Sequence, residues 1–382
     1  MKLFECQNCG QLLHFDNTRC ESCGFRLGYL RSRETISAVK PTGGQLWRAL
    51  AEPRTRYKFC ANGEYGVCNW LVRENQTSPY CAACRHNRTV PDLTQNENVT
   101  RWRKIELAKH RLFYTLIKLN LPLETRVENP DGLAFDFLAS DAPVPIGTMT
   151  PVMTGHDNGL ITINLAEADD AERERTRSQM GEPYRTLLGH FRHEIAHYYW
   201  DRLIANSSHQ EGFRNTFGDE RQDYGAALQR HYSNGPPPNW HENFVTSYAA
   251  SHPWEDFAET WAHYFHMIDT LETARAFGLS VRPTLSKDPE HATKIDFDPH
   301  NTRIERIVDA WLPLTVAVNS INRSMGQPDL YPFVLSPGVK IKLGFIHDRI
   351  YTKDWMPPKT AKPRLKELVA RFRRKSETPA ET

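Results

Sequence analysis

An H-E-x-x-H pentapeptide at residues 193–197 has side chains suited to metal-dependent hydrolysis. On a helix, residues four apart lie on one face about one turn apart, so the imidazoles of His193 and His197 can reach one ion. Glu194 projects beside that face, where its carboxylate can take a proton from a metal-bound water. We therefore expect His193 and His197 to bind a catalytic zinc ion and Glu194 to act as general base. The alternative is an exposed helix face with one buried histidine.

The residues around the pentapeptide favour a helix. Glu182 and Pro183 offer an acidic first turn with a proline near its start, and no glycine or proline interrupts residues 198–205. Such a helix would carry both imidazoles on one rigid element.

A catalytic zinc usually takes three protein ligands and leaves one position for water. One common route adds a histidine six residues after the pentapeptide, with a glycine between them. Leu203 and Trp200 occupy those positions, which excludes this route. The other route is a glutamate on a later helix, which gives two histidines and one carboxylate. Pro253 fits the start of such a helix, and Glu255 and Glu259 follow it one turn apart.

We assign Glu255 as the third ligand and Glu259 as the carboxylate that accepts the free imidazole N–H of a liganding histidine. The reverse assignment, with Glu259 on the metal, stays open, and the alternative without metal is a solvated acidic helix face. His252 and His263 flank the two glutamates and are candidates for lining the substrate cleft.

All eight cysteines precede residue 85 and fall into two sets of four. The first set has the spacing C-x2-C…C-x2-C, and a glycine follows each pair, which suits two tight turns around tetrahedral zinc. So short a segment has little core, and metal binding would supply most of its folding free energy. The first structural zinc is assigned to Cys6, Cys9, Cys20 and Cys23.

The second cysteine set is less regular, and His86 could replace one of its sulfurs. Zinc is again the predicted occupant, and a set of inert buried thiols is the alternative. Several aromatic residues lie between these cysteines and are expected to form the core of the module or its contact with the next domain. The second structural zinc is assigned to Cys60, Cys68, Cys81 and Cys84.

Composition and charge fit an ordinary globular protein: 382 residues, 39% hydrophobic, 25% charged, net charge +2. This balance indicates no general preference for nucleic acid or anionic membranes. The amino-terminal residues lack the apolar core of a signal peptide, and the longest nearly apolar run, residues 310–318, is too short to span a bilayer. A cytoplasmic location is expected, where clustered cysteines indicate metal rather than disulfides.

Hydrophobic patterning predicts the elements around the pentapeptide. Residues 100–119 read as an amphipathic helix, and residues 132–138 and 159–165 as strands. An edge strand before the catalytic helix could pair with an extended substrate. A helix capped by Asp219 is expected after the pentapeptide helix, residues 280–300 are expected to be loop, and 303–322 a strong helix.

The expected fold class is α+β: a zincin-like domain, with a small mixed sheet and a mainly helical lower subdomain, preceded by zinc-ribbon modules. We expect a zinc ribbon at residues 1–30, and a linker (31–44) and a second four-cysteine module within 31–95. The zincin-like domain would span 96–352. Residues 353–382 are expected to form a basic, flexible tail that could contact nucleic acid or anionic lipid, or simply be solvated.

The segment from Thr246 to Glu259 resembles the corresponding helix of lethal-factor-type gluzincin peptidases. Its matching features are Tyr248, seven residues before Glu255, and the E-x-x-x-E pair itself. The resemblance implies that the first glutamate binds zinc and that Tyr248 stabilises the oxyanion. The interval from His197 to Glu255 is longer here than in that family.

The chain as a whole is similar to a bacterial group of zinc-binding metallopeptidases with an amino-terminal zinc ribbon. That resemblance covers most of the chain and implies zinc peptidase chemistry with no known substrate. The residues that carry it are the ribbon cysteines, Cys68-Asn69-Trp70, Phe217-Gly218-Asp219-Glu220, His252-Pro253-Trp254-Glu255-Asp256 and residues 331–337.

Together these features predict a zinc endopeptidase that acts on a peptide or partly unfolded protein, with one catalytic and two structural zinc ions. The ribbons would recruit or gate the peptidase. The alternative is a binding protein whose ribbons recognise nucleic acid or a protein, carrying an inactive peptidase fold. Retention of Glu194 argues against that alternative.

Overall fold

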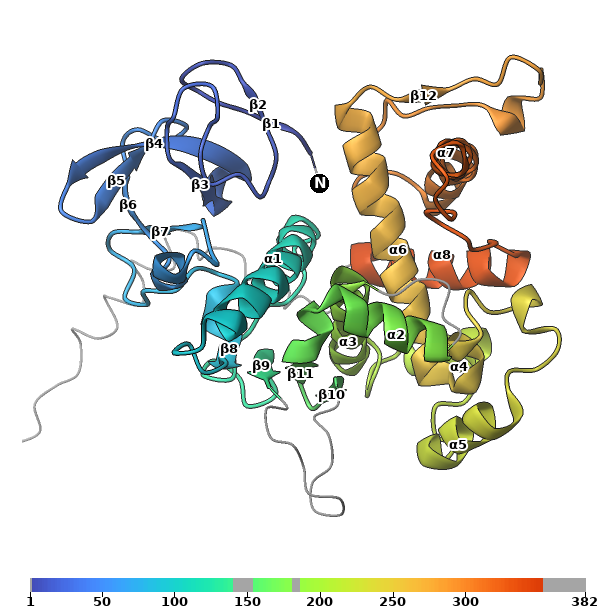
Figure 1. Ribbon diagram of the computed structural model, residues 1–382. Coiled ribbons are helices and arrows are strands. Elements are labelled where there is room, and N and C mark those ends of the chain that lie inside the picture. Colours follow the sequence, from blue (N-terminus) through green and yellow to red (C-terminus); the bar gives the residue numbers. More distant parts are fainter. Residues whose placement is uncertain (1, 140–153, 181–185, 353–382) are drawn as a thin grey trace, which may run out of the picture.

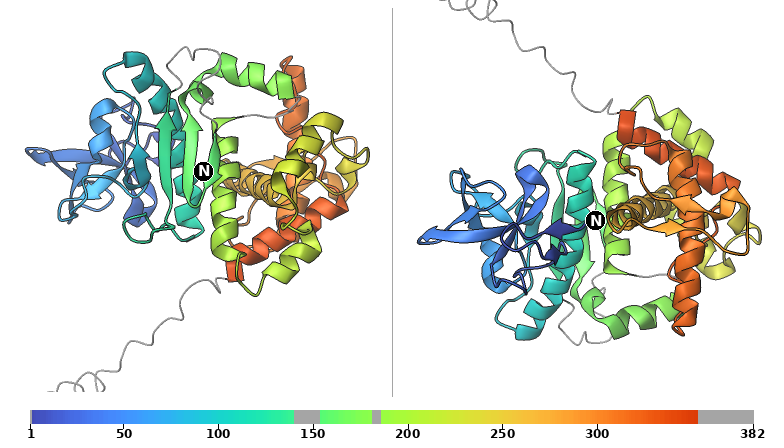
Figure 2. Two further views of the ribbon diagram at one scale, coloured as in Figure 1. Left: turned by 90° about the horizontal axis from the view of Figure 1, so that it is seen from below. Right: turned by 90° about the horizontal axis from the view of Figure 1, so that it is seen from above.

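The computed structural model describes residues 2–139, 154–180 and 186–352. The zinc-ribbon region lies at one end of the molecule and most helices at the other, with helix α1 and a four-stranded sheet between them (Figures 1 and 2). The molecule is α+β, as expected from the sequence. The strands of the amino-terminal region are β1 Phe4–Glu5, β2 Leu12–Leu13, β3 Leu27–Leu30, β4 Thr35–Gly43, β5 Leu46–Ala49, β6 Arg56–Phe59 and β7 Leu71–Arg73.

Residues 31–44, expected to be a linker, instead contain strand β4, which lies between β3 and β5 in an antiparallel five-stranded sheet. The strand is hard to recognise from the sequence because its residues pack into two different cores. Ile36 and Ala38 pack into the main core, whereas Val39 packs into a smaller cluster with Tyr57. Four successive residues are therefore buried, and the alternation of buried and exposed residues that marks a half-buried strand is absent.

The mixed sheet of the second domain has the order β10-β11-β9-β8. The strands predicted at 132–138 and 159–165 correspond to β9 and β11, which are parallel. β10 is antiparallel to β11, lies at the sheet edge and packs against α3. β8 comes from the region expected to belong to the second cysteine module. The four strands are β8 Asn87–Thr89, β9 Ala134–Leu138, β10 Gly155–Asp157 and β11 Leu160–Asn164.

Helix α1 joins the ribbon region to the rest of the molecule. One continuous buried cluster runs from Phe15 and Trp70 of the ribbon region through Tyr114 of α1 to the catalytic helices. The ring centroids of Phe15 and Tyr114 are 5.4 Å apart. The aromatic residues between the second-set cysteines thus help to form an inter-domain contact. The helices around it are α1 Asn96–Lys118, α2 Asp170–Met180, α3 Leu187–Leu203, α4 Gln210–Phe217, α5 Tyr224–Asn234, α6 Pro253–Ala276, α7 Ile304–Ser324 and α8 Pro337–Thr352.

Two helix starts differ from the sequence-based expectation. α3 begins at Leu187, where the Thr186 hydroxyl accepts a hydrogen bond from the Gly189 amide at 2.9 Å, and its first turn carries no acidic residue. The Glu182–Pro183 pair lies outside the described residues. The cap of α5 is Asp223 rather than Asp219, because the Asp219 carboxylate binds the amide and guanidinium of Arg221.

The helices that follow α6 in the chain, α7 and α8, pack against it. Residues 280–300 are mostly irregular, as expected, apart from the short strands β12 Ser280–Val281 and β13 Thr293–Lys294. α7 carries Pro313 in its interior, and α8 closes the fold. The basic tail, residues 353–382, lies outside the described residues. No helix in the described part of the chain combines the length and the apolarity that crossing a membrane requires.

A buried ion pair fastens the catalytic helices to α1. The guanidinium of Arg192 on α3 contacts the carboxylate of Asp269 on α6. The hydroxyl of Thr115 on α1 donates to both oxygens of the same carboxylate, at 2.8 and 2.9 Å. Because Arg192 precedes His193, this contact fixes the helix that carries the H-E-x-x-H pentapeptide.

Replacing Asp269 by alanine should lower the free energy of unfolding by about 3–5 kcal/mol, since it leaves a buried guanidinium without this carboxylate. Urea denaturation followed by circular dichroism measures the change. Glu97→Ala, which removes an exposed ion pair with Arg101 on α1, is the matched control and should cost less than about 0.5 kcal/mol. Equal effects of the two variants would contradict the conclusion that the Arg192–Asp269 contact stabilises the position of α3.

Candidate metal centres

Helices α3 and α6 bring two imidazoles and one carboxylate to a single point. The Glu255 Oε2 atom lies 3.0 Å from His193 Nε2 and 3.7 Å from His197 Nε2. Glu255 is 1% exposed, and the ring of Trp254 packs against that of His197 with centroids 3.9 Å apart. The ligating atoms of His193, His197 and Glu255 all lie within 4.8 Å of one another, a spacing that a single metal ion can bridge.

The hydrogen bonds at this point indicate a cation between the three residues. His193 Nδ1 lies 2.7 Å from Glu259 Oε1, and an ionised carboxylate only accepts, so Nδ1 carries the hydrogen. In the neutral ring, Nε2 then presents a lone pair to Glu255 Oε2, another acceptor. That oxygen is buried without a hydrogen-bond partner among the described residues. These donor atoms fit a zinc ion.

The electrostatic field also favours positive charge here. Burial lowers the pKa of His193, but the carboxylates of Glu255 and Glu259 outweigh burial and raise it well above its usual value. A metal ion would supply this charge and leave both imidazoles neutral.

Glu259 lies on the far side of His193 from Glu255. One of its oxygens accepts from His193 Nδ1, and the other accepts from the Thr246 hydroxyl at 2.8 Å. Burial raises the pKa of Glu259, but the hydrogen bond and charge of His193 outweigh it and hold the pKa below its usual value. This geometry favours Glu255 as ligand and Glu259 as the residue that fixes the ring orientation of His193.

Tyr224 is part of the site, although no sequence motif indicates it. Its hydroxyl donates to Glu255 Oε1 at 2.7 Å, which leaves Oε2 facing the imidazoles. Tyr224 is the first residue of α5, and the Asp223 cap fixes its position. It lies 31 residues before its partner, so only the tertiary structure brings the two together.

Glu194 and Tyr248, the predicted catalytic residues, lie beside the candidate metal ligands. Glu194 follows His193 on α3 and is half-buried. Tyr248 begins the 3-10 turn Tyr248–Ser251 directly before α6, and its ring centroid is 6.0 Å from that of His193. Burial and the charge of Glu255 raise the pKa of Tyr248 well above its usual value, so its hydroxyl keeps the proton that an oxyanion donor needs.

The two histidines expected to line the cleft are buried instead, each 4% exposed. His252 caps α6 by accepting from the Trp254 amide at 3.1 Å, and its other ring nitrogen contacts the Gln222 carbonyl. His263 Nδ1 is 2.7 Å from the Tyr331 hydroxyl, and burial lowers the pKa of His263 to about 4. Both contacts stabilise the packing around α6 and leave little surface for a substrate.

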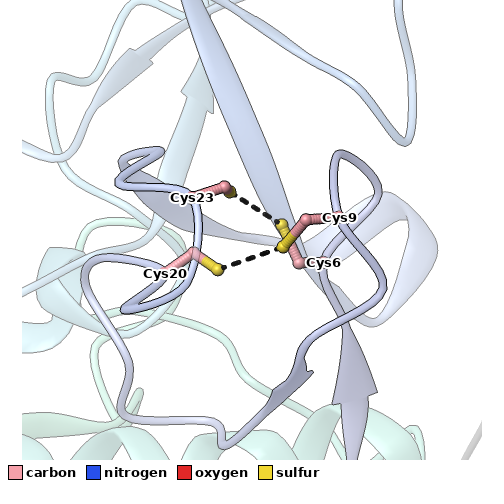
Figure 3. A group of neighbouring side chains, drawn as sticks. All are labelled: Cys6, Cys9, Cys20 and Cys23. Atoms are coloured by element: carbon pink, nitrogen blue, oxygen red, sulfur yellow. Dashed lines mark hydrogen bonds between the residues drawn. The ribbon is translucent and has the colours of Figure 1, made fainter.

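The first cysteine set converges from two tight turns (Figure 3). The Sγ atoms of Cys6 and Cys23 are 3.7 Å apart, and those of Cys9 and Cys20 are 3.6 Å apart. The two turns are alike, since Gly10 and Gly24 each have a positive φ and each donate back to the first cysteine of the pair. Four sulfurs at this spacing fit tetrahedral zinc.

The second cysteine set also converges, with the four Sγ atoms within 4.8 Å of one another. His86, considered as a replacement for one sulfur, is not part of this group. It is buried, its Nδ1 lies 2.9 Å from the Leu133 carbonyl, and burial lowers its pKa to about 3. The set comprises Cys60, Cys68, Cys81 and Cys84.

Two further groups of potential ligands occur among the described residues; one, formed by Cys84, Glu106 and His110, adjoins the second cysteine set, and the other is better explained as an ion-pair network. Asp269, Glu272 and His300 lie close together between α1 and α6. The two carboxylates already face Arg192 and Lys118, so the group has its own cations.

Comparison with known proteins relates most of the chain to two domain families. Residues 98–349 match the family described as "Putative zinc-binding metallo-peptidase", and residues 3–95 match a zinc-ribbon domain. An uncharacterized protein of Mycobacterium bovis and two of Mycobacterium tuberculosis (strains CDC 1551 and H37Rv) are each 43% identical over 349 residues. The alignments cover 91% of this chain and 94% of each relative. No solved structure matches the chain.

Replacing Glu259 by glutamine should weaken zinc binding at the catalytic centre about 10- to 100-fold, because the amide cannot hold the imidazole of His193 as a carboxylate does. Competition with a fluorescent zinc chelator measures the affinity. Glu211→Gln, an exposed position in the first turn of α4, is the control and should leave the affinity unchanged. An unchanged affinity in Glu259→Gln would contradict the role assigned to this residue.

Proposed function

The chain belongs to this zinc-binding metallopeptidase family, and on that premise we propose that it is a zinc-dependent endopeptidase. The observation that carries the proposal is the meeting of His193, His197 and Glu255 with their acceptor atoms facing one another. A site of two histidines and one carboxylate leaves a position for the hydrolytic water.

The side chains around this point have the chemistry that peptide hydrolysis needs. A zinc ion held here would lower the pKa of a bound water to near neutrality and polarise the scissile carbonyl. Glu194 accepts the proton of that water and passes it to the leaving amine. Tyr248 donates a hydrogen bond to the tetrahedral oxyanion, a contribution of about 3 kcal/mol per donor in such sites. Tyr224 and Glu259 hold Glu255 and His193 in place.

The sheet edge beside the catalytic helix suggests how substrate is held. β10 lies at the edge, antiparallel to β11, and packs against α3. An extended peptide pairing with this edge would be read through its backbone, which suits an endopeptidase acting on extended or partly unfolded chains. The ribbons would recruit or gate this activity.

Replacing Glu194 by glutamine should abolish proton transfer and lower cleavage of an unfolded protein substrate by at least about 100-fold, with zinc retained. The assay is a digest of a proteome-derived peptide pool followed by mass spectrometry, with metal counted on the same samples. His193→Ala is the comparison, since it should lose activity and the catalytic zinc together but keep the ribbon zinc ions. A wild-type protein that cleaves no peptide in the pool would sink the proposal.

A second candidate function for the ribbons is contact with nucleic acid, and a row of cations on the five-stranded sheet favours it. Lys40 is directly opposite Arg48, which is directly opposite Arg56, and Lys58 follows on the same face of β6. All four are exposed, and of them only Arg56 has a recorded carboxylate partner, Glu74, within the described residues. Like charges directly opposite on neighbouring strands repel, so an anionic partner would relieve this arrangement.

Charge removal on this face tests that candidate. The double variant Lys40→Ala/Arg48→Ala should weaken binding of a fluorescent single-stranded oligonucleotide. It should also reduce the slope of log affinity against log salt by about 1.4, that is, about 0.7 for each lost phosphate contact. Fluorescence anisotropy over a salt series gives both quantities. The control is Arg101→Ala on α1, and an identical slope in all three proteins would exclude the surface.

A further inference from the structure

The second cysteine set has a fifth potential ligand, contributed by the peptidase domain. His110 lies on α1, and its Nε2 atom is 3.2 Å from Cys68 Sγ, 3.6 Å from Cys84 Sγ and 3.9 Å from Cys81 Sγ. We propose that His110 is a ligand of the second structural zinc, which it binds together with Cys68, Cys81 and Cys84. The ion would then link the ribbon region to the first helix of the peptidase domain through coordinate bonds.

The distances among these four atoms fit one coordination sphere. Zinc bonds of about 2.3 Å to sulfur and about 2.0–2.1 Å to nitrogen, in tetrahedral geometry, separate two sulfurs by about 3.8 Å. The same bonds separate a sulfur from a nitrogen by about 3.6 Å. Cys68 Sγ and Cys81 Sγ are 3.8 Å apart. The three sulfur–nitrogen distances fall on both sides of the expected value, so Nε2 contacts three sulfurs as a fourth ligand would.

The hydrogen bond made by the other ring nitrogen shows which nitrogen of His110 is free to bind metal. His110 Nδ1 lies 2.6 Å from the main-chain carbonyl of Glu106, and a carbonyl only accepts hydrogen bonds. Nδ1 therefore carries the hydrogen, and Nε2 of the neutral ring presents its lone pair to the thiols. This is the usual arrangement of a metal-binding histidine, whose second nitrogen donates to a carbonyl or carboxylate.

The surroundings hold the histidine rigidly. His110 is 3% exposed, and the neighbouring Glu106 and Lys109 are fully buried. Glu106 Oε1 accepts from Lys109 Nζ at 2.9 Å and from the indole N–H of Trp102 at 3.2 Å. The side chain of Asn87 donates to the same oxygen at 2.6 Å. These contacts fix the turn of α1 that aims the imidazole at the cysteines.

Of the four thiols, Cys60 is the one without a hydrogen-bond contact to His110 Nε2 within the described residues. Cys60 is 1% exposed, and its Sγ atom accepts a hydrogen bond from the Cys81 amide at 3.3 Å. Cys68 Sγ and Cys81 Sγ accept similar hydrogen bonds, from the Trp70 and Cys84 amides, so what sets Cys60 apart is the lack of a contact with the imidazole of His110. Cys84 also belongs to a second group of potential ligands, with Glu106 and His110, whereas no cysteine of the first set belongs to a further group within the described residues.

The experiment is ¹¹³Cd NMR of the full-length protein after metal exchange, because the cadmium shift moves upfield when nitrogen replaces sulfur. The expected spectrum has one four-sulfur resonance from the first set and one three-sulfur, one-nitrogen resonance from the second. The catalytic centre, with nitrogen and oxygen ligands only, gives a third and separate signal. Coupling between the second resonance and the His110 ring protons would identify the ligand directly.

Two variants keep the outcome decisive. His110→Gln should shift or abolish the second resonance and leave the first unchanged. Cys60→Ser should keep the three-sulfur, one-nitrogen shift. Two four-sulfur resonances in the wild type, with the second altered in Cys60→Ser, would overturn the proposal and make His110 a hydrogen-bond donor to a four-thiolate site. Because the readout concerns the second set alone, it stands or falls independently of peptidase activity.

Discussion

The structure depends on one electrostatic constraint: three potential ligand atoms, from His193, His197 and Glu255, face one another in a buried site. The site therefore needs positive charge, either from a metal ion or from a proton on His193, whose pKa the carboxylates of Glu255 and Glu259 raise. Atoms left unsatisfied in this low-dielectric environment would cost about 1–3 kcal/mol or more per group. Two helices must therefore be held close enough for these atoms to meet and firmly enough that the site does not relax. The buried contact of Arg192 with Asp269 supplies this restraint next to the first ligand.

Two of the three candidate ligands, His193 and Glu255, are also held by hydrogen bonds from outside their own helices. Glu259 orients His193, and Thr246 in turn holds Glu259. Tyr224 occupies one oxygen of Glu255 and so leaves the other for the metal. Because these partners come from several segments, the geometry of the site is a property of the whole catalytic domain rather than of the pentapeptide. That explains why a large, continuous core surrounds so small a centre.

The parts of this arrangement that follow from local spacing could be predicted from the sequence, and the parts that depend on tertiary contacts could not. One helical turn relates His193 to His197 and Glu255 to Glu259, and two tight turns relate the first four cysteines; such patterns need no knowledge of the fold. Tyr224 and His110 reach their sites from distant segments without a motif. β4 was missed because it faces two cores, and its burial pattern therefore lacks the period of a half-buried strand.

The ribbon region is more than an attached module, because its core is continuous with that of the peptidase domain. Phe15, Trp70 and Tyr114 form one aromatic cluster across the boundary. α1 packs on the ribbons with one face and on α3 with another. A small four-cysteine module has too little core to be stable alone, so metal binding and docking on α1 must both contribute to its folding. Because α1 also packs against α3, the proposed gating by the ribbons would act through α1 on the helix that carries His193 and His197. The ribbons thus have a direct physical route by which metal occupancy or a bound partner could influence the catalytic centre.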